Sequence, residues 1–330
     1  MLRSIKVLGS AVYFPRCSVS AADLERRYGL PPGWVLQKTG VERRHYADGT
    51  EETNAKMGAA ASRAALKQAG LRFCDVSLLI NASATFQQPL PCTAALIQHE
   101  LEETGIPCLD INATCLSFLT ALELASSWLT VHESGRVLIV SSEIASIGLN
   151  WSEPEIACLF GDGAAAFVFE AGGQNDSRII WSGFETFSEA IELCTVKRGG
   201  TAFPAWTYNE RTQPEFLFSM QGPAIHRIAV KRFPMLVGRC LAATGMSATD
   251  VDLFVPHQAG LLPIRMMARR LGFSEEQTVV TIAEHGNVIA ASLPIAFHLA
   301  RERQLIRQGQ NVLFAGTAAG YSQGVILLRV

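Results

Sequence analysis

Three short segments of the chain carry a cysteine, a histidine and an asparagine beside predicted strand ends and helix starts. Cys115 precedes an apolar pattern with helical spacing, His257 ends the strand-like run 252–256, and Asn287 lies in a glycine-bearing turn before another apolar helix. At a helix start the dipole favours a thiolate over a thiol, and the unpaired N–H groups can hold an oxyanion. Together these residues predict covalent acyl transfer through Cys115.

Each of the three residues also has a plain structural explanation. Buried cysteines are usually inert, most histidines of this kind are satisfied core groups, and an asparagine in a turn is most simply an N-cap. Their placement favours function, because ligands of α/β sheets gather at the carboxyl ends of strands. A pseudo-twofold arrangement of the chain would bring Cys115 to His257 and Asn287.

An internal repeat indicates such an arrangement. Residues 66–83 match residues 241–258, and each reads as a helix closed by glycine, a short loop and an apolar strand. Two unrelated units of this common kind are the alternative. The match predicts an α/β fold of two duplicated halves, residues 1–170 and 171–330, with an irregular excursion near 185–222 that could cover a site or be a surface loop.

Composition narrows the function further. The 330 residues carry a net charge of −2 without a basic run, so we expect no nucleic acid partner. We expect no membrane partner, since no stretch approaches ~20 uninterrupted apolar residues, and residues 1–9 resemble a first strand more than a signal peptide. The eight cysteines form no CxxC pair, which argues against disulfides and a zinc site and favours a cytoplasmic protein.

Several motifs in one order resemble the thiolase-fold condensing enzymes, and among them the β-ketoacyl-ACP synthase III family of fatty acid biosynthesis. The motifs are residues 34–44, the Cys115 segment, Gly161-Asp-Gly163, His257-Gln-Ala, His285-Gly-Asn287 and residues 316–324. The resemblance implies a thiolase-like fold packed as α-β-α-β-α layers, and a homodimer.

The resemblance also implies a mechanism. Cys115 would take an acyl group from acyl-CoA or acyl carrier protein, while His257 and Asn287 would assist decarboxylation of a malonyl thioester and its Claisen condensation to a β-ketoacyl product. The backbone N–H groups of Cys115 and Gly320 would form the oxyanion hole, where one donor is worth about 3–4 kcal/mol. Neither a metal nor an organic cofactor is expected, since CoA or phosphopantetheine thioesters are the substrates.

Further positions match family sites for the substrate and its carrier. Trp34 and Lys38 match contacts of the CoA nucleotide, although a core-packed tryptophan fits as well. Leu90 matches the partner subunit's cap on the acyl pocket, or simple packing at a dimer interface, and Gly260 stands where an asparagine meets pantetheine. A set of basic residues on one predicted helix would dock acyl carrier protein or form a solvated face: Arg265, Arg269 and Arg270.

The chain departs from the family pattern at several places. Leu116 and Ser117 replace a small residue and glycine after the nucleophile, Val288 and Ile289 replace Thr-Ser, and Leu262 replaces an arginine. One alternative is therefore a same-fold acyltransferase of specialised metabolism that uses an alcohol, an amine or a second acyl thioester. Another is a weakly active partner subunit of a heterodimer. A papain-like protease shares the residue order but lacks the local signature.

Overall fold

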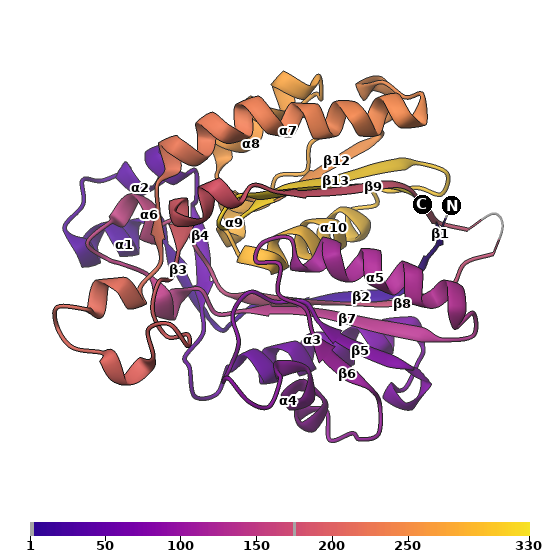
Figure 1. The fold of residues 1–330 in the computed structure, drawn as a ribbon, viewed down its shortest axis with the longest axis horizontal. Coiled ribbons are helices and arrows are strands. Elements are labelled where there is room, and N and C mark those ends of the chain that lie inside the picture. Colours follow the sequence, from indigo (N-terminus) through magenta and orange to yellow (C-terminus); the bar gives the residue numbers. More distant parts are fainter. Residues whose placement is uncertain (1–2, 174–175) are drawn as a thin grey trace.

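The computed structural model describes residues 3–173 and 176–330, and within them five layers are stacked (Figure 1). Two helices lie in the middle layer, α5 (Ser117–Val131) and α10 (Ser292–Glu302). A five-stranded sheet lies on each side of them, and helices cover both outer faces (Figure 1). The predicted α/β fold with α-β-α-β-α layers is confirmed.

The first sheet is formed by residues of the N-terminal half. Its order is β2-β8-β7-β5-β6, where β5 runs parallel to β6 and β7 and the other pairs are antiparallel. Helices α3 (Asn54–Ala69) and α4 (Thr93–Glu100) cover its outer face. Its strands are β2 (Lys6–Tyr13), β5 (Leu78–Asn81), β6 (Cys108–Asp110), β7 (Arg136–Glu143) and β8 (Gly163–Glu170).

The second sheet has the order β1-β9-β14-β13-β12, with β12 parallel to β13 and the other pairs antiparallel. Helices α7 (Gly222–Thr244) and α8 (Leu261–Leu271) cover its outer face. Its strands are β1 (Arg3–Ser4), β9 (Arg178–Thr186), β12 (Leu253–Pro256), β13 (Asn311–Ala318) and β14 (Ser322–Arg329).

The duplicated halves are visible in matching units of the two sheets. Helix α3 ends at Gly70 and leads through η1 (Phe73–Asp75) into β5, just as α7 ends at Gly245 and leads through η6 (Ala248–Asp250) into β12. Both glycines adopt the left-handed conformation, with φ of 68° and 67°, that closes a helix at little cost for glycine alone. The duplication is confirmed, and the boundary between residues 170 and 171 stays a prediction.

The predicted first strand is divided. Residues 1–2 lie outside the described part, β1 joins the second sheet by pairing with β9, and β2 joins the first sheet by pairing with β8. The buried side chain of Ile5 lies between the two strands. The first residues of the chain therefore connect both halves.

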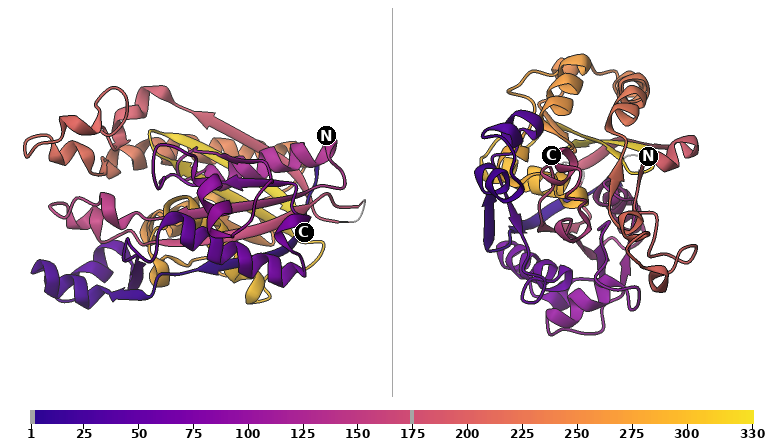
Figure 2. Two further views of the ribbon diagram at one scale, coloured as in Figure 1. Left: turned by 90° about the horizontal axis from the view of Figure 1, so that it is seen from below. Right: turned by 90° about the vertical axis from the view of Figure 1, so that its left-hand side faces the viewer.

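One end of the layered body carries the short elements (Figure 2). The N-terminal part of the chain contributes β3 (Cys17–Ser20), α1 (Ala21–Tyr28), α2 (Trp34–Thr39) and β4 (Arg43–Tyr46). Later parts of the chain contribute η2 (Ser146–Gly148), α6 (Pro154–Ala157) and α9 (Ile282–His285). The segment near 185–222 lies at the same end and contains only short elements, which are η3 (Ser188–Leu193), β10 (Cys194–Thr195), η4 (Ala205–Thr207), η5 (Gln213–Phe216) and β11 (Ser219–Met220).

The stretch Thr114–Val131, which includes α5, matches a membrane span in length and hydropathy, but half of it is buried in the middle layer. Leu119, Leu122 and Leu129 pack into the largest core cluster together with residues of both sheets. A helix between two sheets must be apolar on more than one face. The position of α5 explains its composition without a membrane.

Candidate active site

Cys115 lies in the loop between β6 and α5, two residues before the helix begins. Thr114, which precedes it, has a φ of 50°, a left-handed conformation that is costly for a β-branched residue. The N–H groups of Leu116 and Ser117 donate to the carbonyl oxygens of Ala113 and Thr114 at 3.1 and 3.0 Å. Such strained turns persist only where surrounding contacts hold them, and they cluster at functional sites.

The environment of the Cys115 sulfur keeps the resting thiol protonated. Burial raises the pKa of Cys115, as do the nearby Cys194 and Glu143. Hydrogen bonds from the backbone N–H groups of Ala319 and of Cys115 itself lower its pKa, by a smaller effect. The nucleophilic role predicted for Cys115 therefore requires a base that takes its proton.

The backbone amide that contacts the Cys115 sulfur is that of Ala319, the neighbour of Gly320, whose own amide is predicted for the oxyanion hole. The N–H of Gly320 donates to the carbonyl oxygen of Cys194 at 3.2 Å, so it is already engaged. The N–H of Ala319, one residue earlier, reaches the Cys115 sulfur. The sequence carries no signal for this contact because a backbone donor requires no particular side chain, and the oxyanion role of Gly320 stays a prediction.

His257 follows β12 and is held by its backbone N–H, which donates to the carbonyl oxygen of Ala315 in β13 at 2.9 Å. The side chain is buried, and this desolvation lowers the pKa of His257 to about 4. Its Nδ1 atom has no hydrogen-bond partner among the described residues. The imidazole is therefore neutral near pH 7, and its Nδ1 atom is buried without a partner among the described residues.

Gly316 brings the segments of the cysteine and the histidine together. A Cβ atom at Gly316 would lie 2.9 Å from Cβ of His257 and 3.3 Å from Cδ2 of Leu116. Leu116 is the neighbour of Cys115 and is itself buried in the core. The two segments thus pack against one another across a position that has room only for glycine.

Asn287 is fixed through both its backbone and its side chain. Its backbone exchanges hydrogen bonds with the segment before β8: its N–H donates to Leu159 at 2.9 Å, and its carbonyl accepts from Gly161 at 3.1 Å. Its side-chain Oδ1 accepts from the N–H of Ile289 at 3.0 Å and from the hydroxyl of Ser292 at 3.3 Å. Because a backbone N–H can only donate, the amide orientation is defined and Nδ2 remains as a donor.

The turn after Asn287 reaches the rest of the site. Ile289 has a φ of 44°, a second strained β-branched residue. It begins η7 (Ile289–Ala291), which contacts β7 and α5, the helix that follows Cys115. Each predicted catalytic residue thus lies in a segment that contacts another of the three segments, while the roles of their side chains stay predictions.

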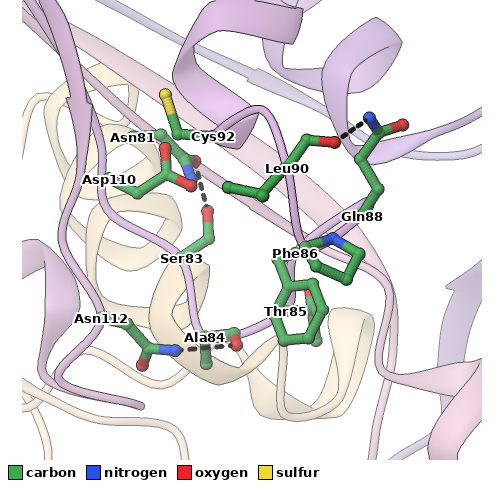
Figure 3. A pocket seen from close by; sticks show the side chains of 11 residues that line it. Asn81, Ser83, Ala84, Thr85, Phe86, Gln88, Leu90, Cys92, Asp110 and Asn112 are labelled. Carbon is green, nitrogen blue, oxygen red and sulfur yellow. Dashed lines mark hydrogen bonds between the residues drawn. The ribbon is translucent and has the colours of Figure 1, made fainter. Parts of the chain in front are cut away.

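A cavity of about 390 Å³ lies beside this site, at the carboxyl end of β5 (Figure 3). Leu90 and Phe86 at its rim are 83% and 59% exposed. The side chain of Asn112 donates to the carbonyl oxygen of Ala84 at 3.3 Å, which joins the cavity wall to the loop of Cys115 (Figure 3). The cavity is lined by Asn81, Ser83, Ala84, Thr85, Phe86, Gln88, Pro89, Leu90, Cys92, Asp110 and Asn112, and by none of the three predicted catalytic residues.

Two predicted substrate residues lie on α2. Lys38 forms an ion pair with Glu155, with Nζ and Oε1 3.1 Å apart. Trp34 packs beside a small core cluster that contains Leu24 and Val35, so the core-packing alternative describes its present contacts. Both positions lie at the end of the molecule that carries the short elements (Figures 1 and 2).

Two other predicted sites lie on and before α8. Gly260 is the residue before the helix, whose Leu261 packs so closely on Gly40 at the end of α2 that a Cβ atom there would lie 2.3 Å from Cβ of Leu261. The basic residues on the helix are all exposed, and they are Arg265, Arg269 and Arg270. Within residues 3–173 and 176–330, no group of three His, Cys, Asp or Glu side chains could hold a metal ion.

Comparison with known proteins agrees with this architecture. The family model for 3-oxoacyl-[acyl-carrier-protein (ACP)] synthase III matches residues 109–187. A second model, for the C-terminal part of the same enzyme, matches residues 241–330. A β-ketoacyl-[acyl-carrier-protein] synthase III of Nitratidesulfovibrio vulgaris is 33% identical over 324 residues, which are 97% of each chain.

Solved structures show the same likeness. The 3-oxoacyl-[acyl-carrier-protein] synthase III from Aquifex aeolicus has a TM-score of 0.88 and 29% identity, over 99% of this chain and 100% of that one. The priming β-ketosynthase from the R1128 polyketide pathway has a TM-score of 0.89 and 27% identity, over 99% of this chain and 97% of that one. The fold is that of the thiolase-fold condensing enzymes, which transfer acyl groups. Within that class, the chain belongs to the β-ketoacyl-ACP synthase III family.

Proposed function

We propose that the chain loads an acyl group onto Cys115 and condenses it with a malonyl thioester to give a β-ketoacyl thioester and CO₂. The observation that carries the proposal is the surroundings of the Cys115 sulfur. It accepts a hydrogen bond from the Ala319 amide, and its segment packs against that of the neutral His257. The amide of Asn287 is oriented so that it can donate.

The acyl-loading step follows from these groups. Cys115 attacks the carbonyl carbon of an acyl thioester and gives its proton to His257, which passes it to the departing CoA or carrier thiol. The amides of Cys115 and Ala319 stabilise the oxyanion that forms in between. The products are the Cys115 thioester and a free thiol.

The condensation step uses the same pocket. The bond between the malonyl carboxylate and its methylene carbon breaks, CO₂ leaves, and the electron pair forms an enolate. Neutral His257 and the Nδ2 amide of Asn287 donate hydrogen bonds to the enolate oxygen. The enolate carbon attacks the acyl carbon, and Cys115 leaves as a thiolate.

Mass spectrometry of the intact protein tests both steps. Incubation with a series of acyl-CoAs should add one acyl mass, and a malonyl thioester should then remove it with release of CO₂. Cys115→Ala should form no adduct, while Cys240→Ala, which changes a buried cysteine in α7, should form it normally. An adduct on the Cys115→Ala protein would contradict the mechanism. A stable adduct that persists with malonyl thioester would favour an alcohol, an amine or a second acyl thioester as acceptor.

In this proposal, the CoA part of the acyl donor binds near α2, and the acyl carrier protein binds at α8. The exposed Arg265, Arg269 and Arg270 of α8 form a basic face that suits an acidic carrier protein. Lys38 would contact the phosphates of CoA, although Glu155 now holds it. Loss of the three α8 arginines should raise the KM for the malonyl carrier protein and leave the KM for malonyl-CoA unchanged.

We further propose a homodimer joined along the first sheet. β6 is the last strand in that sheet, so its outer edge has no partner strand within residues 3–173 and 176–330. Such edges are covered in stable proteins. The exposed Leu109 on β6, with Phe86 and Leu90 near its end, is the kind of apolar surface that a second copy buries. Light scattering should give twice the chain mass, and Leu109→Lys should shift the protein toward monomer.

A cytoplasmic location belongs to the same proposal. All eight cysteines are free, which suits a reducing compartment. Counting free thiols in protein purified without reductant tests whether this state persists.

A further inference from the structure

Glu143, the last residue of β7, has a fully buried carboxylate that the proposed mechanism does not use. Its oxygens accept hydrogen bonds from the N–H of Ala84 at 2.7 Å, the N–H of Thr85 at 2.9 Å and the hydroxyl of Thr85 at 2.6 Å. The same Thr85 hydroxyl accepts from Asn54 at 2.9 Å and from the Ile144 N–H at 3.2 Å. The carboxylate thus anchors the loop that forms the cavity wall.

A second loop is tied to the same carboxylate. The backbone N–H of Ala290, in the turn η7 after Asn287, also donates to Glu143. The charge of Glu143 in turn affects the Cys115 thiol, so the two groups lie within electrostatic reach. One buried carboxylate therefore connects the cavity wall and the asparagine turn beside the nucleophile.

A relay of hydrogen bonds continues from Glu143 to the strained residue before the nucleophile. Ala84 donates its N–H to Glu143 and accepts at its carbonyl oxygen from Asn112 at 3.3 Å. Asn112 accepts at Oδ1 from the N–H of Thr114 at 2.9 Å. Thr114 is the residue with φ of 50° directly before Cys115.

The arrangement of donors is specific for a carboxylate. In the ionised form, its two oxygens only accept hydrogen bonds, and they face three backbone N–H groups and one hydroxyl. A glutamine would present its NH₂ group to some of these donors, and an unsatisfied buried group is costly. No cation pairs with Glu143 in the part of the chain that the structure describes, so its position depends on these hydrogen bonds.

The two strained residues explain what this network does. Thr114 and Ile289, with φ of 50° and 44°, stand beside Cys115 and Asn287. Backbone strain of this kind persists only where surrounding contacts hold it. Glu143 connects to the first through Ala84 and Asn112, and to the turn of the second through Ala290.

We propose that Glu143 is a positioning residue that holds the Cys115 loop and the Asn287 turn in the geometry required for acyl loading and condensation. This inference rests on the proposed function. It predicts that one substitution, at a residue with no part in the proposed chemistry, weakens both half-reactions, while a change further along one arm of the network weakens only one of them.

The test measures two rates by mass spectrometry of the intact protein: acylation of Cys115 by acyl-CoA in a single turnover, and loss of the acyl group when malonyl thioester is added to protein already acylated. Glu143→Gln should lower both rates at least tenfold. Asn112→Ala, which cuts the relay at an exposed side chain, should lower the acylation rate and leave the second rate within twofold.

Asp162→Asn is the matched control. The Asp162 carboxylate is equally buried and accepts from the N–H of Ala47 at 2.9 Å and from the N–H and hydroxyl of Ser146 at 2.9 and 2.6 Å. It lacks the bonds to residues 84, 85 and 290. We expect a loss of stability with both rates within twofold of the wild-type values.

Three results would overturn the proposal. They are a Glu143→Gln protein with unchanged rates, an Asp162→Asn protein with the same loss of both rates, and an Asn112→Ala protein with unchanged acylation. The acylation rate of Asn112→Ala keeps the test decisive if Glu143→Gln does not fold. An adduct on Cys115→Ala would instead refute the proposed function, so the two failures are distinguishable.

Discussion

The hydroxyl of Ser292 donates to Oδ1 of Asn287 at 3.3 Å, and it also accepts from the N–H of Val288 at 2.9 Å. Ser292 is the first residue of the buried central helix α10. The orientation of the Asn287 amide therefore depends on the start of a helix that lies between the two sheets. The Asn287 turn and the middle layer are one structural unit.

Ser292→Ala should slow condensation more than acylation. Removing the hydroxyl leaves one hydrogen bond to orient the Asn287 amide, and a bond of this kind is worth about 0.5–1.5 kcal/mol, or roughly two- to thirteenfold in rate. Single-turnover kinetics of both half-reactions would measure the difference. Ser62→Ala, which removes another buried hydroxyl bonded within α3, is the control and should change neither rate. Equal slowing of both half-reactions by Ser292→Ala would count against this role.

Gly316→Ala should displace His257. The added Cβ would lie 2.9 Å from Cβ of His257 and 3.3 Å from Leu116, and overpacking of this kind costs about 1–3 kcal/mol. We expect a lower urea midpoint and a large loss of condensation activity.

Gly238→Ala is its counterpart, because that position in α7 has no atom within 4 Å of a new Cβ. Alanine there should stabilise the protein by about 0.4–1 kcal/mol. If Gly316→Ala keeps wild-type activity and stability, the close packing around Gly316 is not needed to hold the histidine.

His257 should make the folded state less stable in acid. Burial lowers its pKa from 6.5 to about 4, so the unfolded chain binds a proton more readily than the folded protein. The contribution of the buried, neutral His257 to the free energy of unfolding is fully present above pH 6.5 and is lost as the pH falls from there toward 4. Between pH 7 and pH 5 this loss amounts to about 2 kcal/mol.

Urea unfolding of the wild-type protein and of His257→Gln at pH 7 and pH 5 isolates the contribution of His257 to the free energy of unfolding. Burial also lowers the pKa of His285 to about 4 and raises that of Glu143 to about 7, and both remain in the variant. The difference between the two proteins therefore reports His257 alone. Parallel pH dependences would show that its imidazole is not desolvated.

Glu155→Gln should improve the use of acyl-CoA donors. It frees Lys38 from its ion pair, and an exposed pair of this kind is worth about 0.2–1 kcal/mol. The KM for acyl-CoA should fall by up to about fivefold, while an acyl-pantetheine that lacks the nucleotide should show no change. Lys38→Ala should raise the KM for acyl-CoA. If Glu155→Gln lowered the KM for acyl-pantetheine by the same factor, the effect would not arise from a contact between Lys38 and the CoA nucleotide.

Local patterns in the sequence predicted much of this structure. Glycine-closed helices followed by apolar strands identified the α3–β5 and α7–β12 units and hence the duplicated fold, because capping and periodicity depend on neighbouring residues. The segments of Cys115 and His257 follow the strands β6 and β12 as their apolar runs predict, whereas Asn287 lies between the helix α9 and the turn η7.

Contacts between distant residues were not predictable in this way. Glu143 closes β7 like any polar residue after an apolar run, and its partners come from residues 84, 85 and 290. Ala319 contacts the Cys115 sulfur through its backbone, which carries no side-chain signal in the sequence. The separation of β1 from β2 depends on pairing with a strand that begins at residue 178.

The position of β1 has a consequence for how the chain can be cut and rejoined. Ile179 of β9 pairs with Arg3 on one side and with Leu328 on the other, so the first and last strands are separated by only two strand spacings, about 10 Å. A linker of a few residues would span that distance and make the backbone a closed ring. New ends could then be opened in the exposed excursion near residue 210, away from the central helices. Such a circular permutant would retain every strand pairing of both sheets while its polypeptide began and finished at the periphery.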